Sequence, residues 1–398
     1  MIHIPKTEFA SRIERIRESM KAEGLDVCFV YGDEYRRENL RYVSNYWPIF
    51  ERGALLLPLT GEPILLAAPE GEEVCREMSA WQDIRLIPDF ACVTVPDVIA
   101  YPQANYSSFR DVFKELKIRQ AVRRIGIVGM DAMSHYVLET LRNSLPDCEL
   151  LDANSMLFRA RLTKSENEVA CLKEAARIAD AGYRALLKVA AVGRTELQLA
   201  AAAHEAAYAE GAENIVFCLV SSGARVGTII GRATNKVIED GDMVMAALAV
   251  QYEGYIATAN FPFVVGTMAP AQRELINQLI EANERALACL KTGAPLAAPV
   301  RAVKGYFREL SVDRFDLYPP MHGCGVAEAE SPYPDEQSEG TFAAMMTVNT
   351  DISLFGHPGG SNRIEEGFVI TEDGYEPMSA LVRDLCRQWK ETGSISIE

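Results

Sequence analysis

The chain has 398 residues, of which 48% are hydrophobic and 24% are charged, and its formal net charge is -16. This composition is ordinary for a soluble globular protein, and the length favours two domains over one. The acidic excess argues against a nucleic-acid partner and against an anionic membrane surface, because both require a basic face on the protein.

The nine cysteines include no CxxC pair, so a zinc ribbon or a thioredoxin-type motif has no support. Free thiols in a reducing compartment fit this pattern best. The first residues lack the layout of a signal peptide. The chain has no run of about eighteen apolar residues, so we predict no membrane-spanning helix. We therefore expect a cytoplasmic protein without membrane contact.

The first part of the chain predicts a small α/β domain over residues 1–155. Residues 7–24 have the periodicity of an amphipathic helix that ends at Gly24. Apolar runs at 25–31, 53–68 and 124–129 predict strands, and a Thr-Gly turn interrupts the middle run. Strands that alternate with helices in this way are typical of an α/β domain.

The second part predicts an α+β domain over residues 160–398. Ser165 and Glu168 have the spacing of a capping box, and Thr195 and Gln198 repeat it, so a helix should begin at each site. Beyond residue 215, short strands alternate with turns, interrupted by one long helix from about residue 270 to 291.

Residues 241–266, GDMVMAALAVQYEGYIATANFPFVVG, predict a β-hairpin that turns near Tyr252 and Glu253. In this register Ala247 and Thr258 lie roughly opposite each other. Directly opposed side chains are about 4.5–5.5 Å apart at Cβ, so two aspartates there could hold two metal ions about 3.5–4 Å apart. This chain has a methyl group and a hydroxyl instead, which raises the question of a metalloenzyme scaffold without its metal.

The C-terminal part holds four segments whose order and spacing indicate a site. They are MHGCG (Met321–Gly325), Glu330, VNTD (Val348–Asp351) and RIEEGFVITEDGYE (Arg363–Glu376). In the last segment, Arg363, Glu365 and Glu366 bring charges into an otherwise apolar strand, which is unusual unless one of them faces a pocket. Each segment alone is also compatible with a structural role.

Together these segments resemble the creatinase/prolidase family of pita-bread enzymes, which includes aminopeptidase P, prolidase, creatinase and methionine aminopeptidase. The likeness covers nearly the whole chain. RIERIRESMKAEGLDVCFV and NLRYVSNY resemble the N-terminal domain of the family, and RLTKSENEVACLKEAARIAD resembles the helix that opens its catalytic domain. The resemblance implies a creatinase-type α/β domain followed by a pita-bread domain.

Metalloenzymes of this family bind two metal ions through two aspartates, one histidine and two further acidic residues. In this chain the resemblance keeps the histidine as His322 and one glutamate as Glu365, and it places Asp351 at the other glutamate. Ala247 and Thr258 stand at the aspartate positions. With both aspartates missing, we expect no metal and no other cofactor.

Two further histidines of the family peptidases are also replaced, one by Ala329 and the other by a residue near Ile230. Carboxylates left in a pocket without a cation are costly, so a positive group should take the place of the metal. It would be an internal arginine, such as Arg225, Arg232 or Arg363, or a cationic substrate.

The main hypothesis is a metal-independent, creatinase-like hydrolase that acts on a C–N bond of a small, polar, cationic nitrogen-containing substrate. His322 would transfer the proton, because histidine titrates near neutrality. Glu330 and Glu365 complete the predicted catalytic group, and Asp351 would help to bind the cationic substrate.

Further substrate-binding candidates are Tyr255 and His357, the latter in a glycine-rich loop that could carry it over the pocket. The resemblance to creatinase also implies a homodimer in which Phe50 and Arg52 of one subunit's N-terminal domain complete the partner's site. Arg52 could hold a substrate carboxylate through two hydrogen bonds; a solvated arginine at a strand start is the alternative.

Two other hypotheses remain open. The first is a metallopeptidase similar to Xaa-Pro dipeptidase or aminopeptidase P, whose chemistry requires a metal-activated hydroxide. The second is a catalytically inactive pita-bread protein that only binds a partner. Metal analysis separates the first from the main hypothesis, and a thermal-shift screen of small ligands separates the second.

Overall fold

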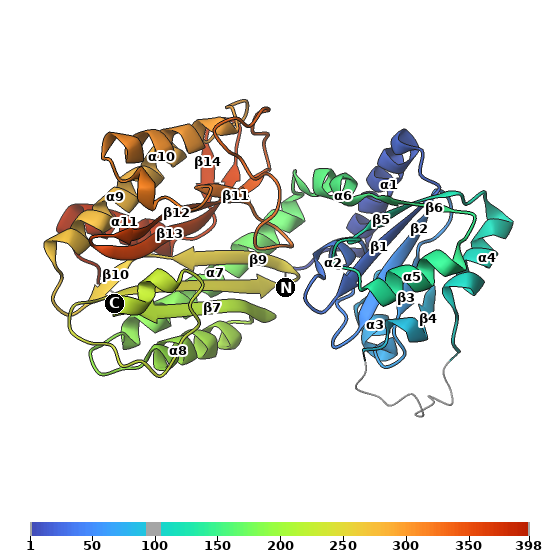
Figure 1. Cartoon of the computed structure of the whole chain (residues 1–398), viewed down its shortest axis with the longest axis horizontal. Helices are drawn as coiled ribbons and strands as arrows, with labels where there is room; N and C mark the ends of the chain where they lie inside the picture. Colours follow the sequence, from blue (N-terminus) through green and yellow to red (C-terminus); the bar gives the residue numbers. More distant parts are fainter. Residues whose placement is uncertain (1, 93–104, 397–398) are drawn as a thin grey trace. The chain divides into compact units, whose positions relative to one another are not determined.

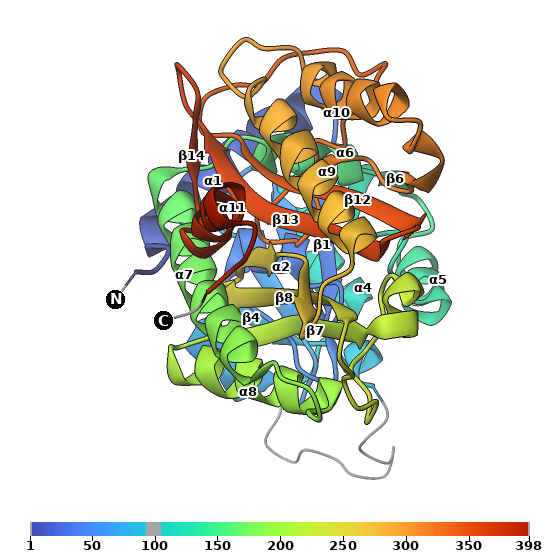
Figure 2. The same ribbon diagram turned by 90° about the vertical axis from the view of Figure 1, so that its left-hand side faces the viewer.

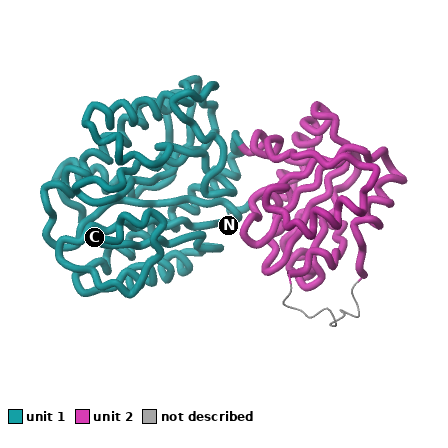
Figure 3. The backbone as a smooth tube through the Cα atoms, viewed as in Figure 1, with its two compact units in different colours: residues 1–3, 162–398 teal, residues 4–161 magenta. Residues whose placement is uncertain are grey.

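The computed structural model describes residues 2–92 and 105–396 (Figure 1). The chain divides into two compact units, an N-terminal unit of residues 4–161 and a C-terminal unit of residues 162–398 together with residues 1–3 (Figure 3). No helix within the described residues is long and apolar enough to cross a membrane. All nine cysteines are free, in agreement with the prediction from their spacing.

The N-terminal unit has a six-stranded sheet in the order β4-β3-β2-β1-β5-β6. Strand β1 pairs antiparallel with β2 and parallel with β5, so the sheet is mixed. Helix α1 ends at Gly24, whose φ of 67° gives the left-handed C-cap predicted from the sequence. The elements are α1 (Lys6–Glu23), β1 (Val27–Asp33), α2 (Glu38–Ser44), β2 (Arg52–Pro58), β3 (Ile64–Ala67), α3 (Glu72–Met78), β4 (Ile84–Leu86), η1 (Pro88–Phe90), α4 (Phe109–Arg119), β5 (Arg124–Val128), α5 (His135–Ser144), β6 (Glu149–Asp152) and α6 (Asn154–Arg161).

The C-terminal unit has an eight-stranded sheet with the order β10-β8-β9-β13-β12-β11, to which β7 adds at β8 and β14 at β13. Both predicted capping boxes are present, at the starts of α7 and α8. The elements are α7 (Glu166–Val189), α8 (Glu196–Ala209), β7 (Asn214–Ser222), η2 (Gly223–Thr228), β8 (Asp242–Tyr252), β9 (Tyr255–Asn260), β10 (Phe263–Val265), α9 (Pro270–Leu287), α10 (Ala297–Glu309), η3 (Asp313–Phe315), β11 (Met321–Gly323), β12 (Thr347–His357), β13 (Gly360–Ile370), β14 (Tyr375–Pro377) and α11 (Leu381–Thr392).

Helices α7, α8, α9, α10 and α11 form the main core of the C-terminal unit with one face of this sheet (Figure 2). Apolar side chains of the central strands, such as Leu248, Ile352 and Ile364, are fully buried in that core. Because successive side chains of a strand point to opposite faces, the alternate residues of the same strands face away from these helices. The candidate site lies on that second face.

The β8–β9 hairpin differs from its predicted register. Its two-residue turn is Glu253-Gly254, both with positive φ (50° and 84°), as hairpin turns of this length require. Ala247 therefore pairs with Asn260, and Thr258 pairs with Ala249. The prediction that Ala247 and Thr258 lie opposite each other is wrong; they are diagonal neighbours on the same face, a wider spacing that long side chains still bridge.

Candidate active site

A pocket of about 490 Å³ opens on the face of the C-terminal sheet opposite to the main core. This volume is in the range of small-molecule sites. The wall is largely apolar, and it also carries charged side chains. The lining residues are Phe217, Leu219, Ile230, Arg232, Tyr318, Pro319, Met321, His322, Glu328, Ala329, Tyr333, Asp351, Arg363 and Glu365.

A row of paired residues crosses five strands of the sheet, and three of its members, Leu219, Glu365 and Asp351, line the pocket. From β7 to β12 the row is Leu219, Ala247, Asn260, Glu365 and Asp351, each paired with the next in register. Residues paired in this way point to the same face of a sheet. The row is apolar at one end and acidic at the other, so the sheet itself sets the polarity of the pocket.

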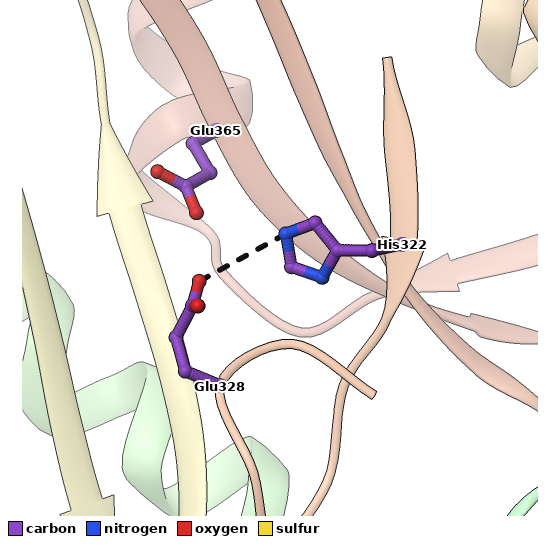
Figure 4. A group of neighbouring side chains, drawn as sticks. All are labelled: His322, Glu328 and Glu365. Carbon is purple, nitrogen blue, oxygen red and sulfur yellow. Dashed lines mark ion pairs between the residues drawn. The ribbon is translucent and has the colours of Figure 1, made fainter. Parts of the chain in front are cut away.

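His322, Glu328 and Glu365 converge at the acidic end of the pocket (Figure 4). His322 is on β11, Glu365 is on β13, and Glu328 is on the segment that follows β11. One nitrogen or oxygen from each of the three lies within 4.8 Å of the others. His322 Nε2 is 3.9 Å from Glu328 Oε1, an ion pair when the imidazole is charged.

Hydrogen bonds orient two of these three side chains. Asn349 Nδ2 donates to Glu365 Oε1 at 2.8 Å, which leaves Oε2 as a buried oxygen with no hydrogen-bond partner among the described residues. His322 Nδ1 lies 2.9 Å from the carbonyl oxygen of Gly323. A carbonyl can only accept, so Nδ1 carries the proton of the neutral ring and the Nε2 lone pair faces the pocket.

Arg363 lies between the two carboxylates of the acidic row. Its Nη1 donates to Asp351 Oδ2 at 3.3 Å, and its Nε is 3.8 Å from Glu365 Oε2. Burial raises the pKa of Glu365 well above its usual range, and Arg363 opposes this rise while Asp351 and Glu328 add to it. Burial also raises the pKa of Asp351, with Arg363 again opposing the effect. Arg363 thus offsets part of the negative charge.

Two predicted site residues are engaged elsewhere in the C-terminal unit. Glu330 is buried and accepts a hydrogen bond from Lys164 Nζ at 2.7 Å, in an ion pair whose side chains are 1% and 4% exposed. Tyr255 is buried, and its hydroxyl donates to Glu168 Oε1 at 2.9 Å. Neither lines the pocket, so the expectation that they face it is corrected: the buried partners Lys164 and Glu168 hold them in structural contacts.

Local contacts also hold the reserve histidine His357 and the predicted arginine Arg225, whereas Arg232 remains at the pocket. His357 packs edge-on against Phe315 and accepts from its own turn, with Gly359 N donating to Nδ1 at 3.0 Å. The expected swing over the pocket has no support, because this turn is closed and the ring is buried. Arg225 pairs with buried Glu196. Arg232 lines the pocket and is exposed.

Arg52 is the first residue of β2 in the N-terminal unit, and Phe50 lies two residues before it. Phe50 is 62% exposed and has a φ of 60°, a left-handed conformation that is uncommon for a bulky residue. Arg52 Nη1 donates to the carbonyl of Ala91 at 3.2 Å. Their predicted contribution to a partner's site stays a prediction.

Glu328 is the residue that sequence reasoning missed. It belongs to the segment Ala327-Glu328-Ala329-Glu330, in which two glutamates alternate with alanines. The prediction named Glu330, the residue after Ala329, and did not consider Glu328. The fold turns Glu328 into the pocket and Glu330 toward Lys164, a choice that depends on partners distant in sequence.

Comparison with known proteins covers both units. Residues 170–372 match the model of the metallopeptidase family M24, and residues 12–163 match that of the creatinase/prolidase N-terminal domain. The Xaa-Pro dipeptidase of Pyrococcus furiosus is 23% identical over 376 residues, which are 94% of this chain and 99% of that protein. The putative dipeptidase YkvY of Bacillus subtilis is 22% identical over 377 residues, which are 94% and 99% of the two chains.

Solved structures are similar over the same extent. The prolidase from Pyrococcus horikoshii has a TM-score of 0.79 at 21% identity, covering 93% of this chain and 98% of that one. The X-Pro aminopeptidase from Thermotoga maritima also has a TM-score of 0.79 at 21% identity, covering 93% and 97%. The predicted fold, a creatinase-type α/β domain followed by a pita-bread domain, is confirmed.

Proposed function

The chain belongs to metallopeptidase family M24, and we propose that it hydrolyses the peptide bond of a dipeptide-sized substrate in the pocket. The predicted resemblance and the predicted hydrolase class are confirmed by this membership. The relatives named as an Xaa-Pro dipeptidase and as a putative dipeptidase favour the peptidase hypothesis over the metal-independent hydrolase that the sequence suggested first. The observation that carries the proposal is the convergence of His322, Glu328 and Glu365 inside a small-molecule pocket.

Metallopeptidases require a metal ion, so the side chains of this site must be able to bind one if the chain is a peptidase. The two positions expected for aspartates hold Ala247 and Thr258, and a methyl group cannot ligate an ion. A full two-ion ligand set is therefore not available. The set His322, Glu328 and Glu365, with one buried carboxylate oxygen unpartnered, does fit one divalent cation. Such a cation would supply Lewis acidity toward the scissile carbonyl and a water nucleophile.

The remaining polar side chains of the site have positioning roles in this proposal. Asn349 fixes the carboxylate plane of Glu365 through its 2.8 Å hydrogen bond. Arg363 donates a hydrogen bond to Asp351 and lies near Glu365, so its positive charge reduces the electrostatic repulsion between these two carboxylates. Fixed partners of this kind reduce the reorganisation needed in the transition state.

The apolar wall determines what the rest of the substrate contacts. Phe217, Leu219 and Ile230 come from β7 and the segment after it, and Tyr318 and Met321 from β11 and the segment before it. Such a wall excludes water and accepts an apolar side chain or ring. A small peptide with one apolar residue next to the scissile bond fits this arrangement.

The proposal is tested by assaying the chain against a panel of dipeptides, with Xaa-Pro and Xaa-Ala pairs compared, after dialysis against a chelator and again with added Mn²⁺. Product amino acids are quantified by mass spectrometry. We expect turnover that requires the added cation. Full activity in chelator on a guanidino or cyclic amidine compound, with no peptide cleaved, would instead establish the metal-independent hydrolase.

That second candidate is favoured by one observation, the guanidinium of Arg363 between Asp351 and Glu365, since it already provides a cation to the acidic row. From the resemblance alone we also propose a cytoplasmic homodimer in which Phe50 and Arg52 contribute to the partner's site. Sedimentation analysis measures the dimer, and mixing Arg52→Ala chains with His322→Ala chains tests the shared site, because complementation requires residues from both subunits.

A further inference from the structure

We infer that Arg232 binds a carboxylate group of the substrate, on the side of the pocket away from Glu365, and so determines which peptides the site accepts. The inference deepens the proposed function and depends on it for the peptide nature of the ligand. The carboxylate comes either from the C-terminus of a short peptide or from an acidic side chain. Measurements of binding separate these two sources and need no turnover.

Arg232 is the available cation of the pocket. The described lining has two arginines, Arg232 and Arg363. The Arg363 guanidinium donates to Asp351 at 3.3 Å, and its side chain is 8% exposed. Arg232 is exposed, and its guanidinium has no hydrogen bond or ion pair with any described residue, although three carboxylates line the same pocket. Its planar group can therefore hold a ligand carboxylate through two parallel hydrogen bonds.

The register of the sheet separates Arg232 from the acidic residues. Arg232 forms an antiparallel β-bridge with Leu219, the first residue of the row that crosses the sheet. Paired residues point to the same face of a sheet, and both of these residues line the pocket. The bridge thus adds one position to the row, at the end opposite to Glu365 and Asp351. The extended row begins with a cation, passes three uncharged side chains and ends with two carboxyl groups.

The length of this row fits a short peptide. Four successive pairings connect Arg232 to Glu365, which places their Cα atoms about 19 Å apart along the sheet. Two extended residues span at most about 7 Å, and three span about 11 Å. The side chains of Arg232 and Glu365 extend over the rest of the distance from the two ends. A peptide of two or three residues can therefore have its scissile bond near Glu365 and a carboxylate at Arg232.

The loop that begins at Arg225 and ends at Arg232 is fixed at its base. Arg225 Nη2 donates to the carbonyl oxygen of Arg232 at 3.1 Å. Arg225 also forms an ion pair with Glu196, whose side chain is fully buried. The Glu196 carboxylate accepts from Ser222 N at 2.8 Å and from Thr234 N at 3.0 Å, which lie on the two sides of the loop. Because its backbone is held in this way, Arg232 loses little backbone freedom when it binds a ligand.

The tip of the same loop is strained and presents an apolar side chain to the pocket. Ile229 has a φ of 60° and a ψ of -68°, and Ile230 N donates to the carbonyl oxygen of Thr228 at 2.7 Å. This geometry is a γ-turn with positive φ, which is rare and unfavourable for a β-branched residue. Ile230 is 71% exposed and lines the pocket. Backbone strain of this kind clusters where a segment clamps a ligand, in agreement with a loop that contacts the substrate through Ile230 and Arg232.

The experiment measures the binding of three peptide analogues to the full chain by calorimetry in the presence of Mn²⁺. In each analogue a methylene group replaces the scissile carbonyl, so no turnover occurs. The analogues are Ala-Leu with a free C-terminal carboxylate, the neutral Ala-Leu amide, and the Ala-Glu amide, whose carboxylate is on the side chain. Arg232→Gln should weaken binding of one carboxylate-bearing analogue by about tenfold, the loss of one charge-assisted contact, and leave the neutral amide unchanged. The analogue that is weakened identifies the source of the carboxylate.

Two further variants make the test specific. Arg194→Gln removes an exposed arginine of the same unit that is not in the described pocket lining, and it should bind all three analogues like the parent. Arg232→Glu should reverse the preference and bind the neutral amide more tightly than the carboxylate-bearing analogues. Circular dichroism confirms that each variant is folded. Equal effects of Arg232→Gln on all three analogues, or no binding of any analogue to the parent chain, would overturn the inference. Discrimination by Arg232 without cleavage of any peptide would leave it standing and refute only the proposed activity.

Discussion

Glu365 and Glu366 are consecutive residues of β13 that point to opposite faces of the same sheet, and both side chains are almost completely buried. Glu366 faces the helices, where Arg383 Nε donates to Oε2 at 2.7 Å and Asn283 Nδ2 donates to Oε1 at 2.7 Å. Glu365 faces the pocket with one oxygen unpartnered and its nearest cation 3.8 Å away. The two carboxylates are thus equally buried, but hydrogen-bonding and cationic partners satisfy Glu366 much more completely than Glu365.

The difference separates structural acids from functional ones. A buried ion pair that is hydrogen-bonded on all sides fixes the packing of α9 and α11 on the sheet, whereas an uncompensated carboxylate costs free energy of folding. Proteins retain a buried carboxylate at this cost in stability where a functional site requires it. Glu330 and Glu328 repeat the contrast within one loop, since Glu330 pairs with Lys164 and Glu328 faces the pocket.

The largest effect on stability should come from a substitution of Glu366, the structural member of this pair of glutamates. Glu366→Ala leaves the Arg383 guanidinium without its main partner and should lower the free energy of unfolding by about 3–5 kcal/mol. Urea denaturation measures the change. Glu376→Ala removes an exposed ion pair with Lys173, whose side chains are 37% and 55% exposed for Lys173 and Glu376. This control should change stability by less than about 0.5 kcal/mol.

Glu365→Gln tests the functional side. Turnover should fall by about a hundredfold or more, as when a group that acts on the reacting atoms is removed. The melting temperature should be unchanged or higher, because the variant replaces a buried carboxyl group whose ionised form burial disfavours and keeps an acceptor for Asn349. A large loss of stability with normal turnover of the folded fraction would show that Glu365 is structural, like its neighbour.

A smaller effect should appear at Glu51, a buried acid of the N-terminal unit. It accepts from Gly71 N at 2.8 Å, and burial raises its pKa to about 7. Between about pH 4.5 and 7 the folded state then binds more protons than the unfolded state, so stability falls as the pH rises through this window and is constant above it. Glu51→Gln should remove this slope.

At pH 8 the Glu51→Gln variant should be more stable than the parent by on the order of 1 kcal/mol. Thermal melts at pH 5 and pH 8 give the comparison, and Glu62→Gln, an exposed residue of the same unit, provides the control. An unaltered slope in Glu51→Gln would mean that burial alone does not mark an uncompensated acid, which weakens the same argument at Glu365.

Local sequence chemistry determined much of the fold. Capping boxes at Ser165 and Thr195 set the starts of two helices, and Gly24 set the end of the first. These signals were readable because each involves hydrogen bonds within about one turn of the helix terminus. The order of the C-terminal segments also identified His322 and Glu365, which the fold brings together.

Tertiary structure decided which polar residues share the pocket. Register depends on the positive φ of Glu253 and Gly254 in a two-residue turn, and this turn moved the partner of Ala247 from Thr258 to Asn260. Lys164, 166 positions away in the sequence, donates a hydrogen bond to the Glu330 carboxylate, so Glu328 is the glutamate of this segment that faces the pocket. Buried charges are assigned by proximity in space, which no local pattern of residues encodes.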